Sequence, residues 1–341
     1  MRTHAILCFL AIIVVFGTER RTAIKGCGGW RLCLEHDPEK NETWTWFATW
    51  NATVQSKLEI LATISRTQEP REGKKEGMLV VMSGDSTIVH QFTLLLEFVR
   101  LRDDFNPLQG DDAEVRQKYE MTFGAERGTP GSVTFLFYRV FEKCMLSPSN
   151  EDVRHAYGVY FGCGLHLLHS IPIKHPPMLK VALESWINYD TLIRERVQGF
   201  KQVNGGVKLV YMTTHPVDES LYVGEWKKMM EGYAARDPVF LDLCVERFKP
   251  ILTARSLSGD ELENICLDTV FGTRAVELLN RRGLSAIRGL NVSVVPAHRL
   301  VANERWATFP GDGVHYSLFA PVELFWFLTL LEDDEGVGYR A

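Results

Sequence analysis

From residue 78 onwards, short and continuous apolar runs alternate with stretches in which apolar residues recur at helical spacing. Apolar runs of about four to eight residues, rich in Val, Phe and Tyr, are typical of strands in a parallel sheet that is covered on both faces. The predicted strands are residues 78–83, 132–138, 156–162, 207–213 and 291–296. The predicted helices are residues 87–101, 177–200, 219–236, 260–282 and 317–331.

Strands that alternate with helices predict a three-layer α/β/α sandwich with a mainly parallel, five-stranded sheet. We expect a flavodoxin-like strand order, in a domain that occupies residues 76–341. Gly283 is the expected C-terminal cap of the helix over 260–282. In such sheets the reactive groups lie beyond the carboxyl ends of the strands, so the turns at these ends are the first places to inspect.

The segment before this domain has a different composition. Residues 26–53 contain Cys27, Cys33 and four tryptophans but few aliphatic residues. This composition predicts a small, irregular, Cys- and Trp-rich cap within an N-terminal segment that covers residues 26–75. The tryptophans would either pack against one another or form a surface on which sugars stack.

An uncharged apolar run at residues 5–17 follows Met1, Arg2, Thr3 and His4. The run is shorter than the ~20 residues of a membrane-spanning helix but suits the apolar region of a secretory signal. We therefore expect residues 1–25 to be a signal peptide or a signal anchor. The rest of the chain would face the secretory lumen, in the Golgi behind a type II anchor or outside the cell after cleavage. Contact with a membrane would then occur only through this segment.

Glycosylation sequons and cysteines agree with a secretory route. Asn41, Asn51 and Asn291 each begin an Asn-X-Ser/Thr sequon. An even number of cysteines beyond the apolar run fits three disulfides in an oxidising compartment, with several buried free thiols as the alternative. These cysteines are Cys27, Cys33, Cys144, Cys163, Cys244 and Cys266.

Net charge and cysteine spacing argue against two kinds of binding partner, nucleic acid and zinc. A net charge of −5 and the lack of a long Lys/Arg block argue against a dedicated nucleic-acid binder. The sequence has no Cys-X-X-Cys pair, so we expect no zinc site. No cofactor is expected either.

The turn Gly84-Asp85-Ser86 follows the first predicted strand and precedes a helix. The start of a helix has unpaired amide N–H groups and the positive end of the helix dipole. Ser86 at this place would be a nucleophile, and its backbone N–H would donate to an oxyanion. The alternative is a structural role, in which Ser86 or Thr87 caps the helix.

Asp312 and His315 lie three positions apart between the last predicted strand and the last helix. A serine hydroxyl needs a base to become a nucleophile, and an imidazole base needs a carboxylate on its other ring nitrogen. The spacing lets Asp312 orient His315. Because both turns border the same sheet, the sequence predicts that Ser86, His315 and Asp312 form a catalytic triad.

The combination of GDS after the first strand and DxxH before the last helix resembles the SGNH/GDSL hydrolase superfamily. In detail the chain is similar to the PC-esterase branch, which includes trichome-birefringence-like and sialate O-acetyltransferases. "GDSTIVHQF" (84–92) resembles the first motif of that branch, with Gln91 kept and Val89 and His90 near the place of its basic residue. The resemblance covers residues 75–331, where "VTFLFYRVF", "VYFGCGLH" and "LVYMTTHP" resemble further blocks of the branch.

The resemblance implies that Ser86 is the nucleophile, His315 the base and Asp312 the acid that orients it. The superfamily builds its oxyanion hole from the nucleophile's N–H, a glycine N–H and an asparagine side chain, but Gly162 stands where the branch has Asn. Backbone N–H groups of Gly162 or Gly164, together with that of Ser86, would then bind the oxyanion. Further candidates for substrate contact are Asp85, Arg139, His166 and His215, with structural roles as the alternative.

These features predict a serine-dependent O-acyl transferase or esterase that acts on glycans, with acetyl as the first choice of acyl group. The acyl-serine would pass its acyl group to water or to a sugar hydroxyl, and the sequence leaves both open. The expected partners are a glycan or another O-acylated substrate and, for transfer, an acyl donor in the lumen. A catalytically weak or inactive glycan-binding ectodomain is the alternative, because the asparagine is missing and the N-terminal segment is rich in tryptophan.

Overall fold

The computed structural model describes most of the chain from residue 41 onwards. The described residues are 41–67, 77–98, 117–140, 146–162, 165–168, 176–235, 237–252, 255–270, 272–302, 308, 313–316 and 319–332. The predicted signal or anchor at residues 1–25 therefore lies outside them. None of the described helices is long and apolar enough to cross a membrane.

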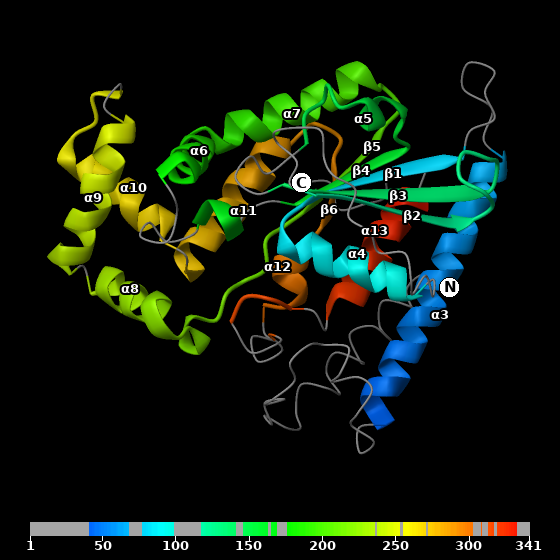
Figure 1. Ribbon diagram of the computed structural model, residues 1–341, viewed down its shortest axis with the longest axis horizontal. Coiled ribbons are helices and arrows are strands. Elements are labelled where there is room, and N and C mark those ends of the chain that lie inside the picture. Colours follow the sequence, from blue (N-terminus) through cyan, green and yellow to red (C-terminus); the bar gives the residue numbers. More distant parts are fainter. Residues whose placement is uncertain are drawn as a thin grey trace.

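A six-stranded sheet forms the centre of the molecule, in the order β2-β3-β1-β4-β5-β6 (Figure 1). Five strands run parallel to one another, as the sequence predicts, and their bounds agree with the predicted ones to within a few residues. They are β1 (Met78–Gly84), β3 (Ser132–Arg139), β4 (Gly158–Gly162), β5 (Lys208–Met212) and β6 (Ser293–Val295).

The sixth strand corrects the predicted count of five. β2 (Gln117–Gly124) pairs antiparallel with β3 and lies at the edge of the sheet. Its sequence QKYEMTFG alternates polar and apolar residues, with Tyr119 and Met121 buried. A search for continuous apolar runs misses such a strand, because an edge strand need not be covered on both faces.

Helices cover both faces of the sheet. Successive strand residues point to opposite sides, so an apolar strand contributes side chains to a core on each face. In β1, Val80 and Met82 belong to one buried core and Val81 to the other. The first core contains α3 (Asn41–Thr67), α4 (Ser86–Phe98) and α13 (Ala320–Glu332). The second contains α5 (Glu151–His155), α6 (Pro176–Ile187), α7 (Tyr189–Val203) and α11 (Thr273–Ile287).

The expected irregular N-terminal cap is wrong for residues 41–53, which belong to the long helix α3 (residues 41–67). Val54, Leu58 and Leu61 are fully buried against the sheet layer, at a spacing that places them on one face of the helix. Lys57 also forms an ion pair of 2.5 Å with Glu332 of α13. Residues 26–40 of the expected cap lie outside the described part of the chain.

Several predicted helices are divided in the structure. The stretch 177–200 becomes α6 and α7, and 219–236 becomes a short 3-10 turn η3 (Glu219–Leu221) followed by α8 (Gly224–Ala234). The stretch 260–282 becomes α10 (Gly259–Thr269) and α11. Four helices are absent from the sequence prediction: α3, α5, α9 (Pro238–Leu252) and α12 (Ala297–Leu300).

Gly283 does not cap a helix as expected, since it lies within α11. The helix continues to Ile287 and packs closely against β5 at this glycine. A Cβ atom added to Gly283 would lie 2.3 Å from the hydroxyl oxygen of Tyr211. The glycine therefore allows a close approach between a helix and the sheet.

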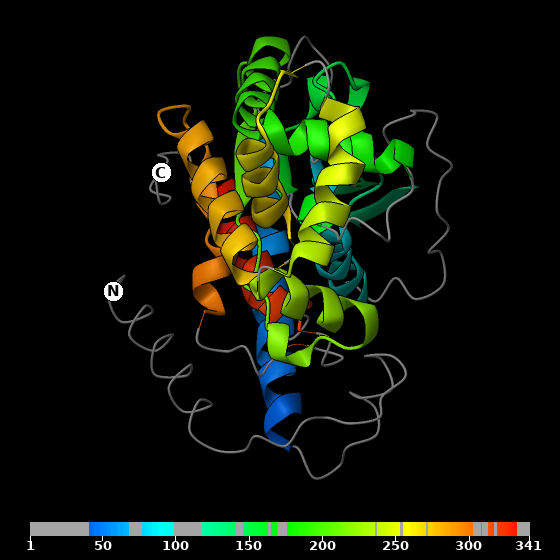
Figure 2. The same cartoon turned by 90° about the vertical axis from the view of Figure 1, so that its left-hand side faces the viewer.

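A group of helices, α8, α9 and α10, lies to one side of the sheet, as Figures 1 and 2 show. A disulfide between Cys244 and Cys266 joins α9 to α10, and both cysteines are fully buried. The sequence predicts three disulfides without their pairing, and this is one disulfide between two of the six cysteines. Cys27, Cys33, Cys144 and Cys163 lie outside the described residues.

We predict that Gly283→Ala lowers the free energy of unfolding by about 1–3 kcal/mol, because the new methyl group overlaps Tyr211 in a well-packed core. Urea denaturation measures the change. The matched control is Gly259→Ala at the start of α10, where an added Cβ has no neighbour within 4 Å and stability should be unchanged or slightly higher. Equal stability of the two variants would contradict the close packing of α11 on β5.

Candidate active site

The turn between β1 and α4 contains a glycine, Gly84, and a capping aspartate, Asp85. Asp85 is buried, and its Oδ1 accepts a hydrogen bond of 3.0 Å from the backbone N–H of Thr87. The capping residue is therefore Asp85, which corrects the alternative that Ser86 or Thr87 caps the helix. This capping role is sufficient to account for Asp85 in the Gly84-Asp85-Ser86 turn. The substrate contact that the sequence suggests for Asp85 is not needed to explain it.

Gly84 brings β1, β4 and α4 close together at the carboxyl ends of the strands. A Cβ atom on Gly84 would lie 2.7 Å from Cδ1 of Ile88 and 2.9 Å from the carbonyl oxygen of Gly162. Gly162 is less restricted, since the nearest atom to its Cβ would be Cε of the flexible Met212 side chain, at 3.0 Å. A small residue is therefore required at Gly84 for α4 to start where it does.

The loop after β5 is held by a pair of hydrogen bonds from α11. The side-chain amide of the buried Asn280 donates to the carbonyl oxygen of Thr214 and accepts from its backbone N–H, both at 2.8 Å. Thr213 accepts a hydrogen bond of 3.0 Å from the backbone N–H of His298. Hydrogen bonds with Asn280 and His298 therefore hold the two residues that precede His215.

His215, Glu323 and Gln91 form a buried polar cluster from three separate elements. His215 is 2 % exposed, Glu323 1 % and Gln91 0 %. Nε2 of His215 is hydrogen-bonded to Oε1 of Glu323, and the other carboxylate oxygen accepts a hydrogen bond of 2.5 Å from the Gln91 amide. A buried carboxylate is costly unless it is paired and hydrogen-bonded, and here both of its oxygens have partners.

Tyr160 of β4 lies next to this cluster. Burial raises the pKa of its hydroxyl well above the ordinary value, and the negative charge of Glu323 raises it further, although the nearby Gln91 side chain acts in the opposite direction. Tyr160 is therefore a neutral hydroxyl at any physiological pH. It cannot supply a base to the site.

The loop that carries His315 is anchored to the loop after β5. The backbone N–H of Asp218 donates a hydrogen bond of 2.7 Å to the carbonyl oxygen of Gly313. Gly313 has a φ of 75°, and a Cβ atom there would lie 2.3 Å from the carbonyl oxygen of Asp218. Only glycine fits this combination of a left-handed backbone and a close contact.

His315 lies beside α4, although the two are far apart in the sequence. Its ring stacks on that of His90, with 5.0 Å between the centroids and 29° between the planes. The next residue, Tyr316, is buried against His215 with 5.3 Å between the ring centroids. Ser86 is the first residue of α4, one helical turn before His90, so both positions belong to the same side of the helix.

A small cavity of about 10 Å³ lies among these residues. It has room for about one water molecule. The side chains of three histidines from different elements line it, and the complete lining is Thr87, His90, His215, His315, Tyr316, Ala320 and Glu323.

The remaining predicted site residues are only partly described. Gly162 ends β4 and Arg139 ends β3, where Arg139 is the register partner of Gly84. His166 belongs to the 3-10 turn η2 (Leu165–Leu168). Asp312, the expected acid of the triad, and Gly164 lie outside the described residues.

The three sequons fall at different kinds of position. Asn41 is the first residue of α3 and Asn51 lies within that helix. Asn291 is exposed just before β6 and has a φ of 50°. Asparagine is one of the residues that tolerate this left-handed conformation.

Sequence analysis does not identify Glu323 as a site residue. The available signal is a single acid within the otherwise apolar segment APVELFWFLTLL, which forms most of α13. A charge on an apolar helix needs a partner when the helix is buried. The identity of that partner, His215, depends on how the helix packs and cannot be obtained from spacing.

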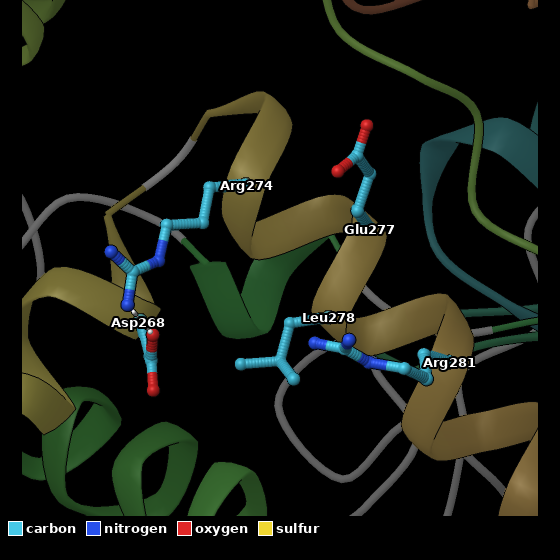
Figure 3. A pocket seen from close by; sticks show the side chains of 5 residues that line it. All are labelled: Asp268, Arg274, Glu277, Leu278 and Arg281. Carbon is cyan, nitrogen blue, oxygen red and sulfur yellow. Dashed lines mark hydrogen bonds and ion pairs between the residues drawn. The ribbon is translucent and has the colours of Figure 1, made fainter.

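A larger hollow of about 450 Å³ lies on the surface of α10 and α11 (Figure 3). Its charged side chains are partly paired, since Arg274 forms an ion pair of 2.9 Å with Asp268. The other lining residues are Glu277, Leu278 and Arg281. None of the five is a histidine or a hydroxyl nucleophile, so the hollow offers no acyl-transfer chemistry. In the described part of the chain, no group of three or more His, Cys, Asp or Glu residues is arranged so that it could hold a metal ion.

No protein-family model and no curated protein matches the chain.

We predict that His215→Leu and Glu323→Leu each lower the free energy of unfolding by about 3–5 kcal/mol, because each leaves a buried polar partner unpaired. The double variant should lose much less than the sum of the two. Urea denaturation of the four proteins measures this coupling. As a control, the exposed pair His155 and Glu151 on α5 should show a coupling below about 1 kcal/mol. Strictly additive losses at His215 and Glu323 would mean that the buried pair does not form.

Proposed function

We propose that this chain is a serine-dependent O-acyl hydrolase or transferase that acts on glycans, with acetyl as the first choice of acyl group. The observation that carries the proposal is the position of His315. Its ring stacks on His90, one helical turn beyond Ser86, at the carboxyl ends of the parallel strands. A nucleophile and a base from distant parts of the sequence would then share one side of α4.

The strand order supports an SGNH-type fold. Counted along the chain, the five parallel strands lie in the order 2-1-3-4-5, which is that of flavodoxin-like sheets. We therefore propose a flavodoxin-like three-layer sandwich with β2 added at one edge. In open sheets of this kind ligands bind outside the carboxyl ends of the strands, where the turn after β1 and the loop after β5 both lie.

The proposed reaction has two halves. In the first, Oγ of Ser86 attacks the acyl carbonyl carbon and His315 accepts the hydroxyl proton, while Asp312 orients the imidazole. His315 then gives that proton to the departing sugar oxygen. In the second half, water or a sugar hydroxyl attacks the acyl-serine and the proton transfers are repeated.

The start of α4 would stabilise the oxyanion. The N–H groups of the first helical residues have no acceptor within the helix, and the dipole there favours negative charge. Asp85 uses the N–H of Thr87 for its cap, which leaves the Ser86 N–H as the proposed oxyanion donor. Gly162 lies next to Gly84, and its N–H or that of Gly164 is the proposed second donor.

A secretory location fits the one disulfide among the described residues. The Cys244–Cys266 bridge is buried between two helices, and stable disulfides are typical of oxidising compartments. We therefore propose that the chain works in the lumen of the Golgi or outside the cell, on O-acylated glycans. An acyl donor in the lumen is needed only if the enzyme transfers the acyl group to a sugar.

We predict that Ser86→Ala lowers the turnover of p-nitrophenyl acetate by about 10⁴–10⁶-fold and abolishes labelling by a fluorophosphonate, because both need the serine oxygen. His315→Asn should produce a loss of similar size. Ser149→Ala is the matched control, since Ser149 is an exposed serine in the turn before α5. Equal and negligible turnover in the wild type and in Ser86→Ala would favour the glycan-binding ectodomain instead.

A second measurement separates hydrolysis from transfer. The enzyme is acylated with a labelled acetyl donor and then supplied with water alone or with an oligosaccharide acceptor. We expect labelled acetate in both cases if the enzyme is an esterase, and labelled oligosaccharide in the second case if it is a transferase. Mass spectrometry of the products gives the ratio of the two.

A further inference from the structure

His215 is an imidazole oriented by a carboxylate, and it is distinct from the proposed base His315. Its Nε2 is hydrogen-bonded to Glu323. Its Nδ1 is buried and has no hydrogen-bond partner among the described residues. The ring is almost completely shielded from solvent, and His215 lines the small cavity beside His315. A buried ring nitrogen without a partner normally indicates an ordered water or another small ligand.

The size of the cavity restricts its ligand. At about 10 Å³ it has room for about one water molecule and is too small for a sugar hydroxymethyl group. A buried water needs two to four polar partners. His215 supplies one, and the cavity is also lined by the polar side chains of Thr87, His90 and His315.

We propose that the cluster of His215, Glu323 and Gln91 holds the water molecule that hydrolyses the acyl-serine, so that the enzyme is an esterase. This inference rests on the proposed function and names its acyl acceptor. His215 is a positioning residue, because it acts on the water and not on the acyl group.

The hydrogen bonds of the cluster prepare His215 for this task. A carboxylate only accepts, so the contact with Glu323 favours the tautomer that carries its proton on Nε2 and leaves Nδ1 as an acceptor. Gln91 holds the second carboxylate oxygen, and Asn280 holds the peptide of Thr214 next to the histidine. The ring is thus fixed in its tautomer and in its position, as histidines at reactive sites usually are.

The hydrolytic step balances without any further reactant. The water oxygen forms a bond to the acyl carbon while one of its protons moves to the ring of His315. The bond between the acyl carbon and Oγ of Ser86 then breaks, His315 returns the proton to Oγ, and the carboxylic acid leaves. Throughout, the other O–H of the water donates a hydrogen bond to Nδ1 of His215, which gains no proton.

The test separates the two half-reactions with His215→Gln. The glutamine amide keeps a donor for Glu323 but removes the acceptor at the place of Nδ1. We expect the initial burst of one acyl group per enzyme to remain and the steady-state rate to fall by ~10²-fold, because the water loses its position. Intact-protein mass spectrometry should then show accumulated acyl-enzyme. His155→Gln, an exposed histidine on α5, is the matched control.

Two outcomes would overturn the inference in an active enzyme. Acylation and deacylation would slow by the same factor in His215→Gln if the histidine were only structural, and labelled oligosaccharide would exceed labelled acetate if a sugar were the acceptor. Glu323→Gln, which keeps the shape of the side chain, repeats the test if His215→Gln does not fold.

A measurement without turnover distinguishes this inference from the proposed function. Long-range ¹⁵N–¹H NMR spectra of the wild type report the tautomer of each histidine, and we expect the proton of His215 on Nε2. A proton on Nδ1 would overturn the inference even in an active enzyme. A wild type that neither reacts with a fluorophosphonate nor turns over an ester would refute the proposed function, whatever the tautomer.

Discussion

The buried carboxylate of Glu323 is the constraint on which the site depends. α13 is otherwise apolar and packs on the sheet, so an unpaired charge within it would be very costly. The charge is accommodated because His215 and Gln91 approach it from the loop after β5 and from α4. These contacts hold α13 in one position relative to both elements. The loop with His315 precedes α13 directly, so its approach to α4 follows from the same contacts.

Close packing of backbone complements this polar cluster. Gly84 and Gly162 let α4, β1 and β4 meet at the carboxyl ends of the strands, and Gly313 lets the loop with His315 lie on the carbonyl of Asp218. A side chain is not tolerated at Gly84 or Gly313, because a Cβ atom there would overlap a backbone oxygen. A site assembled in this way has little room for adjustment, which is consistent with a cavity of only about 10 Å³ between its histidines.

The local pattern of apolar residues is sufficient to predict some of the helices and strands but not others. The five parallel strands follow from runs such as MLVVMSG, because a strand buried on both faces must be apolar throughout. The edge strand β2 does not meet that criterion. The first part of α3 is rich in tryptophan and contains two sequons, a composition that suggests irregular structure instead of a helix. Helix ends at Asn188 and Gly272 were missed because amphipathic periodicity continues across them. The predicted Ser86 turn falls between a strand and a helix as expected.

The sequence by itself determined the alternation of strands and helices, the turn that places Ser86 at the start of α4, and the proximity of His315 to the last helix along the chain. Periodicity and turn chemistry are local, so they are legible in a single sequence. Only the tertiary structure decided that His90 stacks on His315 and that Glu323 pairs with His215. A hydrogen bond or ring contact requires atoms within a few ångströms, and residues distant in sequence reach that distance only through the packing of the whole fold.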